Sequence, residues 1–284
     1  MIIGNDKQAV IENIKKKAEE GDFNEKVEIN DPKISSQQKE EIINNYLSKR
    51  KKLTYKINNT TARAIVKTVA WSENRATQVV GMENVKDIKT GAIITSNHFN
   101  PLDSTIIRKL IRKARKRNLY IVGQEANLAM PGLVGYMMNY ADIIPISDKV
   151  SYMKKAFPEM LTEKLKKNQW ILIYPEQEMW FNYKKPRPPK PGAYYFAAKN
   201  NVPIIPCFVE MIETNELENE EFYKVNYVLH VLPPIYPEKG KTTKENSIIM
   251  MNKDYELKKK AYEKAYGKKL DYHFSYDDIA GLIK

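Results

Sequence analysis

Short apolar runs alternate with helical patterns along most of this chain. Several of the runs are continuously apolar, which is typical of strands covered on both faces by helices. The predicted helices span 61–73, 104–116, 151–167 (interrupted by Pro158), 192–200 and 253–266. The predicted strands are Thr77–Val80, Ala92–Thr95, Leu119–Val122, Asp142–Ile146, Trp170–Tyr174, Pro203–Val209 and Val225–Leu232. This alternation predicts an α/β fold with a single mixed, largely parallel sheet flanked by helices.

The first 55 residues have a different pattern, with many charges and narrow apolar stripes. One predicted helix runs from Asp6 to Glu20, and a second begins at Ser35, with Gln38 as its capping-box partner, and runs to about Leu53. The basic run 49–52 is either a solvated helix end or a docking face for anionic lipid or an acidic carrier protein. We predict a basic helical N-terminal segment over 1–55 and an α/β domain over 56–284.

The composition narrows the classes of partner. Apolar residues make up 42% of the chain and the formal net charge is +12, which predicts attraction to anionic lipid, phosphorylated substrates or nucleic acid. With Cys207 as the only cysteine, the chain has no internal disulfide framework. Residues 1–6 lack the features of a signal peptide, and no apolar run approaches 18 residues, so we expect an intracellular protein without a transmembrane helix.

A histidine and an aspartate lie five residues apart where a predicted strand leads into a helix. His98 is in the loop, Asn100 and Pro101 suit the helix start, and Asp103 is predicted in the first helical turn. A loop imidazole beside a carboxylate can act as a general base with its orienting group. The alternative is that Asp103 only caps the helix and His98 is an ordinary polar loop residue.

Three other stretches carry candidate chemistry. Residues 108–117 include seven basic residues and no acid, either a solvated face or a surface for an anion. The buried strand that ends at Pro175 delivers Glu176, which either orients a substrate hydroxyl or serves as a structural acid. The two prolines of the run 201–207, Pro203 and Pro206, predict an edge or rim strand.

The order of these stretches resembles the glycerolipid acyltransferase family, which includes the lysophosphatidic acid and glycerol-3-phosphate acyltransferases. The resemblance covers residues 78–235. It rests on four motifs taken together: Gly81-Met82-Glu83-Asn84-Val85, Asn97-His98 with Asp103, Tyr174-Pro175-Glu176, and Val202-Pro203-Ile204-Ile205-Pro206.

The resemblance implies a role for each motif. His98 would be the general base that deprotonates the acceptor hydroxyl, and Asp103 would orient its imidazole. Glu176 would help to place the acceptor, and the residues Asn97, Pro203 and Pro206 would border the acyl-donor site. The donor would be an acyl carrier protein or coenzyme A thioester, with no bound cofactor and no metal.

Some family positions differ in this chain. Gln177, Glu178 and Met179 replace the Gly, Thr and Arg that usually follow Pro-Glu, and Ser147 follows the second motif where an arginine is usual. Lys185 and Arg187 would compensate by binding the acceptor phosphate, unless their loop is merely a rigid surface loop. Alternatively the acceptor lacks a phosphate, since Gln177 and Glu178 suit a sugar or polyol headgroup.

The leading hypothesis is therefore an acyltransferase for a lysophospholipid such as 1-acyl-glycerol-3-phosphate, acting in phospholipid biosynthesis. We expect it in the cytoplasm, bound peripherally to the anionic inner face of the membrane. The segment 129–138 either packs in the core, lines an acyl-chain groove or dips into the membrane. One alternative keeps the chemistry with a lysoglycolipid or other non-phosphate acceptor. Another is a basic anion-binding protein without activity, although no nucleic-acid module is present and no nucleic-acid partner is expected.

Overall fold

A computed structural model describes residues 7–29 and 34–283. Asp6, the predicted first residue of the N-terminal helix, lies outside these ranges. So do residues 1–5, on which the signal-peptide expectation also rests, and Lys284. Within them, no helix combines the length and the apolar character needed to cross a membrane.

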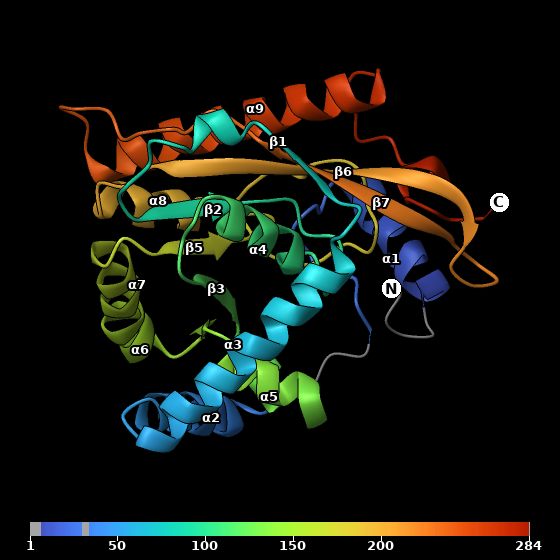
Figure 1. Cartoon of the computed structure of the whole chain (residues 1–284). Helices are drawn as coiled ribbons and strands as arrows, with labels where there is room; N and C mark the ends of the chain where they lie inside the picture. The colour runs from blue at the N-terminus through green and yellow to red at the C-terminus, as the bar shows by residue number, and fades with distance from the viewer. Residues whose placement is uncertain (1–6, 30–33, 284) are drawn as a thin grey trace.

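The core is one seven-stranded sheet with the order β1-β7-β6-β2-β5-β3-β4 (Figure 1). Among the seven strands of the described residues, β6 and β7 pair antiparallel and the other neighbours pair parallel, so the predicted mixed, largely parallel sheet is confirmed. All seven predicted strands are present, and β6 continues well beyond its predicted end. The strands are β1 (Gln78–Val80), β2 (Ala92–Thr95), β3 (Leu119–Gln124), β4 (Ile143–Ile146), β5 (Trp170–Ile173), β6 (Ile204–Leu217) and β7 (Tyr223–Val231).

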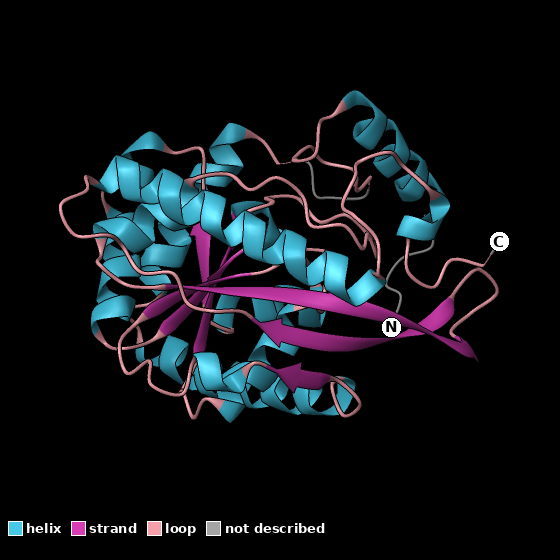
Figure 2. Ribbon diagram, turned by 90° about the horizontal axis from the view of Figure 1, so that it is seen from above, coloured by secondary structure: helices cyan, strands magenta, loops and turns pink. Residues whose placement is uncertain are grey.

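Helices cover both faces of the sheet (Figure 2). Ile94 and Leu172 face α4 (Ser104–Lys113), whereas their neighbours Ile93 and Ile171 face the opposite core cluster. The alternation arises because successive side chains of a strand point to opposite faces. The opposite face is covered by α7 (Ala156–Lys166), α8 (Gly192–Lys199) and α9 (Thr243–Tyr266), and α6 (Val150–Lys154) precedes α7. The prolonged β6–β7 ribbon projects beyond the other strands in Figure 1.

The N-terminal helices are α1 (Lys7–Glu20), α2 (Ser36–Lys49) and α3 (Leu53–Glu73). The predicted capping box is confirmed, since Gln38 N donates to the Ser35 hydroxyl (3.3 Å) and Ser35 N donates to the Gln38 side chain (2.8 Å). The predicted boundary at residue 55 falls inside α3, and α2 places Ile43 in the same core cluster as the sheet residue Ile144. The N-terminal helices are therefore integrated with the α/β fold.

Several helices differ from their predicted extent, among them the helix predicted over 61–73, which begins at Leu53. α9 begins ten residues earlier than predicted, because Thr242 and Glu245 form a capping box there. α5 (Gly132–Tyr140), which follows the 3₁₀ turn η2 (Glu125–Ala129), occupies most of the segment 129–138. Two further 3₁₀ turns are η1 (Met82–Asn84) and η3 (Tyr276–Asp278).

We predict that Gly91→Ala destabilises the protein, because a Cβ at Gly91 would lie 2.3 Å from the backbone oxygen of Leu165 at the end of α7. Relieving that overlap requires a shift between α7 and β2, for which a loss of about 2 kcal/mol in the free energy of unfolding is expected. Gly192→Ala is the control, since a Cβ there meets no atom within 4 Å. Urea unfolding of both variants checks the prediction, and equal stabilities would contradict it.

Candidate active site

The loop after β2 places His98 beyond the carboxyl end of a central strand, where sites form in α/β sheets. Asp103 immediately precedes α4, and its side chain makes no capping bond. The prediction that Asp103 lies in the first helical turn is therefore wrong by one residue. Its Oδ2 instead accepts hydrogen bonds from Phe99 N (3.0 Å) and Asn100 N (3.3 Å). The carboxylate thus organises the loop that carries His98.

The His98 imidazole is held by Asp103 and Tyr174. Nδ1 of His98 lies 2.7 Å from Asp103 Oδ2, and the imidazole stacks on the Tyr174 ring with 3.9 Å between centroids. The Tyr174 hydroxyl donates to Asp103 Oδ1 at 2.5 Å. An ionised Asp103 favours the tautomer with its proton on Nδ1, which leaves Nε2 able to accept a proton. The His98 side chain is 21% exposed and Asp103 only 3%, so solvent reaches the imidazole but not its carboxylate partner.

Glu176 is the second acid of the site, and it is buried among hydrogen-bond donors. Its Oε2 accepts from His98 N at 3.2 Å and forms an ion pair with Arg187 Nη2 at 2.9 Å. Arg187 N donates to Oε1 at 3.0 Å. Burial lowers the pKa of the Arg187 guanidinium, and the Glu176 charge opposes that shift. Glu176 therefore fixes the main chain of His98.

Arg187 and Lys185, which are expected to bind an acceptor phosphate, are both buried and paired with acids in this structure. The Arg187 side chain is 1% exposed, and its remaining N–H groups donate to the backbone oxygens of Phe23, His98 and Glu178. Lys185, 3% exposed, forms an ion pair with Asp278 at 2.7 Å and donates to His273 O. Their loop is not a free surface loop, because it packs into the interior.

The residues expected to border the acyl-donor site make hydrogen bonds to the sheet or strand pairings within it. Asn97 bonds the backbone of Val209 in β6 through both its side-chain oxygen (2.8 Å) and its nitrogen (3.1 Å). Pro203 O accepts from Ile93 N near the amino end of β2, so the structure does not bring Pro203 to His98. Pro206 pairs with Thr95 inside the sheet. The predicted edge or rim strand is wrong, because β6 lies between β2 and β7.

The turn after Glu176 adopts the backbone that a glycine favours. Gln177 has φ +67°, in the left-handed region where the resembled family has glycine, and its side chain is exposed. The next residue, Glu178, accepts a hydrogen bond from Gln124 Nε2 at 2.6 Å, which joins the carboxyl ends of β3 and β5. The Gln124–Glu178 pair is therefore neutral and acidic, whereas phosphate is bound by cations.

The basic face of α4 is partly used inside the protein. Lys109 donates to the backbone oxygens of Asn74 (2.6 Å) and Thr77 (2.5 Å), and Lys116 donates to Lys89 O and Thr90 O. Burial lowers the pKa of Arg108 to about 10. The predicted one-sided anion surface is therefore reduced to the exposed Arg112, Lys113, Arg115 and Arg117.

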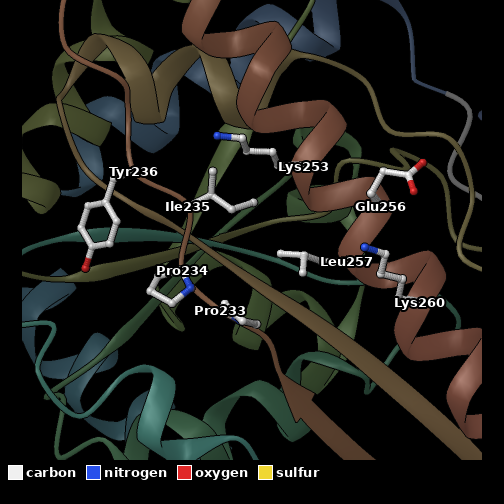
Figure 3. A pocket seen from close by; sticks show the side chains of 8 residues that line it. All are labelled: Pro233, Pro234, Ile235, Tyr236, Lys253, Glu256, Leu257 and Lys260. Carbon is white, nitrogen blue, oxygen red and sulfur yellow. The ribbon is translucent and has the colours of Figure 1, made fainter.

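Away from His98, the described residues form a pocket but no metal-binding cluster. Within residues 7–29 and 34–283, no cluster of three or more His, Cys, Asp or Glu side chains could hold a metal ion. A pocket of about 370 Å³ lies between α9 and the segment after β7 (Figure 3), and it is lined by Pro233, Pro234, Ile235, Tyr236, Lys253, Glu256, Leu257 and Lys260. None of these side chains contributes to the His98 contacts described above.

The region around His98 is similar in sequence to a known protein family. Residues 76–210, which include every side chain that holds His98, match the sequence model of the family described as Acyltransferase. These residues therefore form an acyltransferase domain, and the predicted family is confirmed over that range. The crystal structure of the 1-acyl-sn-glycerophosphate (LPA) acyltransferase PlsC from Thermotoga maritima is similar over 76% of this chain and 81% of its own, with 19% identity and a TM-score of 0.49. No curated protein matched the sequence.

Sequence reasoning missed several residues of the site. Tyr174 was noted only as part of the Tyr-Pro-Glu turn, yet it contacts both members of the His98–Asp103 pair. Trp180 N donates to His98 O at 3.1 Å, and Phe23 and Asn24 contact the loop from the N-terminal segment. The Tyr-Pro-Glu turn was a signal for Tyr174, whereas the pattern of residues 22–25 carries none.

We predict that Tyr174→Phe lowers the free energy of unfolding at neutral pH. We also predict that this free energy then falls less steeply at alkaline pH than it does in wild type. The lost hydrogen bond to a buried carboxylate is expected to cost about 1.5–3 kcal/mol. Burial and the Asp103 charge raise the pKa of Tyr174 well above its usual value. The folded protein therefore holds this proton more tightly than the unfolded chain, and the stabilisation is lost as pH rises above about 10.

Urea unfolding between pH 7 and pH 11 measures both effects in wild type and in Tyr174→Phe. Tyr195→Phe, at an exposed position on α8, is the matched control. A Tyr174→Phe variant with wild-type stability and the wild-type alkaline decline would contradict the prediction.

Proposed function

We propose that this acyltransferase moves a fatty acyl group from an acyl thioester to the free hydroxyl of a lysophospholipid such as 1-acyl-glycerol-3-phosphate. The observation that carries the proposal is the 2.7 Å contact between His98 Nδ1 and Asp103 Oδ2 within the acyltransferase domain. The donor would be an acyl carrier protein or coenzyme A thioester.

In the proposed mechanism, His98 acts as the general base. Nε2 takes the proton of the acceptor hydroxyl while the hydroxyl oxygen attacks the thioester carbonyl. The tetrahedral intermediate collapses, the carbon–sulfur bond breaks, and the thiolate leaves with the proton returned from Nε2. Asp103 stabilises the imidazolium between these two transfers, and the Tyr174 hydroxyl holds Asp103 in place. No acyl-enzyme is formed, and atoms and charge balance without another reactant.

A second candidate has the same chemistry with an acceptor that lacks a phosphate, such as a lysoglycolipid. Two observations favour it: Arg187 and Lys185 are already paired with Glu176 and Asp278, and the Gln124–Glu178 pair presents neutral and acidic groups near the site. Amide and carboxylate groups bind sugar hydroxyls well and attract phosphate poorly.

We predict that His98→Ala reduces acyl transfer at least about 100-fold, because removal of a general base costs about 10²–10⁴ in rate. Transfer is measured with labelled acyl-coenzyme A and acyl carrier protein thioesters, each offered 1-acyl-glycerol-3-phosphate and a lysoglycolipid. His273→Ala is the control, since its side chain takes no part in the contacts that hold His98. Undiminished transfer by His98→Ala would contradict the mechanism, and preference for the lysoglycolipid would select the second candidate.

We further propose that the enzyme binds the inner face of the cytoplasmic membrane through the exposed face of α3. Three large apolar side chains lie on this face, Leu53 (71% exposed), Ile57 (61%) and Trp71 (51%). The helix has no acid before Glu73, while Lys51, Lys52, Lys56 and Lys67 are exposed beside the apolar side chains. An apolar stripe with a tryptophan and flanking lysines suits the interface of an anionic bilayer.

The neighbouring helix α5 also exposes apolar side chains. Tyr136 of α5 donates to Asn58 O of α3 at 3.1 Å, and α5 exposes Leu133 and Val134. Both helices therefore present apolar side chains to solvent. Exposed apolar surface of this kind is typical of a site that binds a membrane or another protein.

We predict that Ile57→Asp weakens binding to phosphatidylglycerol vesicles about tenfold or more, because a fully buried isoleucine contributes about 1.5–3 kcal/mol. Sedimentation with vesicles at low and high salt measures the binding, which salt should weaken. Ile248→Asp, at an exposed isoleucine of α9, is the matched control. Equal binding by the two variants would contradict the assignment of this face.

A further inference from the structure

The chain segment that follows α1 contacts the loop beneath His98. We propose that residues 22–25, called the strap below, position His98 for proton transfer through Glu176, Trp180 and Arg187. The inference rests on the proposed function, in which His98 is the general base. It assigns positioning roles to the strap residue Asn24 and to Arg187.

The strap makes three kinds of contact with the loop that follows β5. Phe23 O accepts a hydrogen bond from Arg187 Nη1 at 2.9 Å. The Asn24 side chain donates to Glu176 O (3.2 Å) and to Pro188 O (2.8 Å). The last contact is from Trp180 Nε1 to Glu25 O, at 2.9 Å. The strap therefore holds Glu176, Trp180 and Arg187 together.

Each of these three loop residues also holds the main chain of His98. The Glu176 carboxylate accepts from His98 N at 3.2 Å. On the other side of the residue, His98 O accepts from Trp180 N (3.1 Å) and from Arg187 Nη2 (3.3 Å). Both backbone polar groups of His98 thus depend on side chains or backbone that the strap fixes.

Arg187 is the central connection in this arrangement. Its guanidinium lies over the Trp180 ring, 4.6 Å from the centroid, and is paired with the Glu176 carboxylate. One end of the guanidinium reaches Phe23 in the strap, and the other reaches His98. A lysine could retain the charge but could not reach both backbone oxygens, because it lacks the planar fork of an arginine.

The strap is itself fixed to the body of the protein. Ile11 and Ile14 of α1 belong to the same core cluster as Trp180, and Asn13 Nδ2 donates to Val27 O at 3.0 Å. The same cluster includes Phe222, which precedes β7, and Ile279 of the C-terminal segment. From that segment, the Tyr272 ring contacts Phe23 with 4.3 Å between centroids. The strap is therefore a braced element rather than a loose tail.

The physical consequence concerns the imidazole. Asp103 fixes the ring from one side, but a shift of the His98 main chain would move Nε2 relative to the acceptor hydroxyl. A displacement of about 1 Å in a reacting group can cost about 100-fold in rate. Asn24 acts only on the loop, so its loss should lower kcat more than it raises KM for the thioester.

The test uses the full chain with Asn24→Ala and, separately, Arg187→Lys. The expected result for Asn24→Ala is a kcat lower by about tenfold or more, with KM for the acyl thioester within about twofold of wild type. Nuclear magnetic resonance of the imidazole nitrogens gives a second measurement that does not need activity. The chain has three histidines, so the His98 signal can be assigned by substituting the other two. We expect this signal to shift in both variants.

Asn246→Ala is the matched control. The Asn246 side chain also donates to two backbone oxygens, those of Glu238 and Lys241, at the start of α9. It should lose stability as Asn24→Ala does but keep the wild-type kcat and the wild-type His98 signal. An equal loss of kcat in Asn246→Ala would overturn the proposal, because general destabilisation would then explain both variants.

The outcomes separate this inference from the proposed function. Wild-type kcat and an unchanged His98 signal in Asn24→Ala would overturn the role of the strap while leaving acyl transfer intact. If wild type transfers no acyl group to any acceptor, the proposed function fails. The His98 signal then still decides whether the strap holds the histidine.

Discussion

In the turn that follows β5, the Glu176 carboxylate accepts a hydrogen bond from the backbone of His98 and pairs with the buried guanidinium of Arg187. A charge in this interior is tolerated only with its partner in place, and removal of one member of a buried pair typically costs about 3–5 kcal/mol. The loop from Glu176 to Pro188, the His98 loop and the segment after α1 all converge on this pair. The position of the His98 main chain therefore depends on this buried ionic contact.

His98 is held on two sides by different means. Asp103 and Tyr174 fix the imidazole, while Glu176 and Trp180 fix the main chain. The parallel pairing of β2 with β5 makes this possible, since it brings the carboxyl ends of both strands to the same edge. The proposed general base is therefore preorganised, because its rotamer and its backbone are both determined before substrate binds.

The positive charge of the chain is not concentrated at His98. Arg187 and Lys185 neutralise buried carboxylates, and Lys109 binds backbone oxygens. Exposed lysines instead accompany the apolar face of α3. A net positive charge therefore indicates attraction to anions in general. The location of the exposed cations decides which surface binds the anions. In this protein the exposed lysines beside α3 support the membrane face proposed above.

The sequence alone determined the seven strands, the class of sheet and the His98–Asp103 pair, because apolar runs and a spacing of five residues are local properties. It also identified the acyltransferase family from the order of the motifs. Only the tertiary structure decided which residues Tyr174, Arg187 and Asn24 contact, because their partners are far away in the sequence. Tyr174 is 71 residues from Asp103, and Arg187 is 89 residues from His98. Asn24 is 152 residues from Glu176. Whether an arginine is free to bind phosphate depends on which carboxylate the fold places beside it. That choice is made by strand order and packing, and no single stretch of sequence records it.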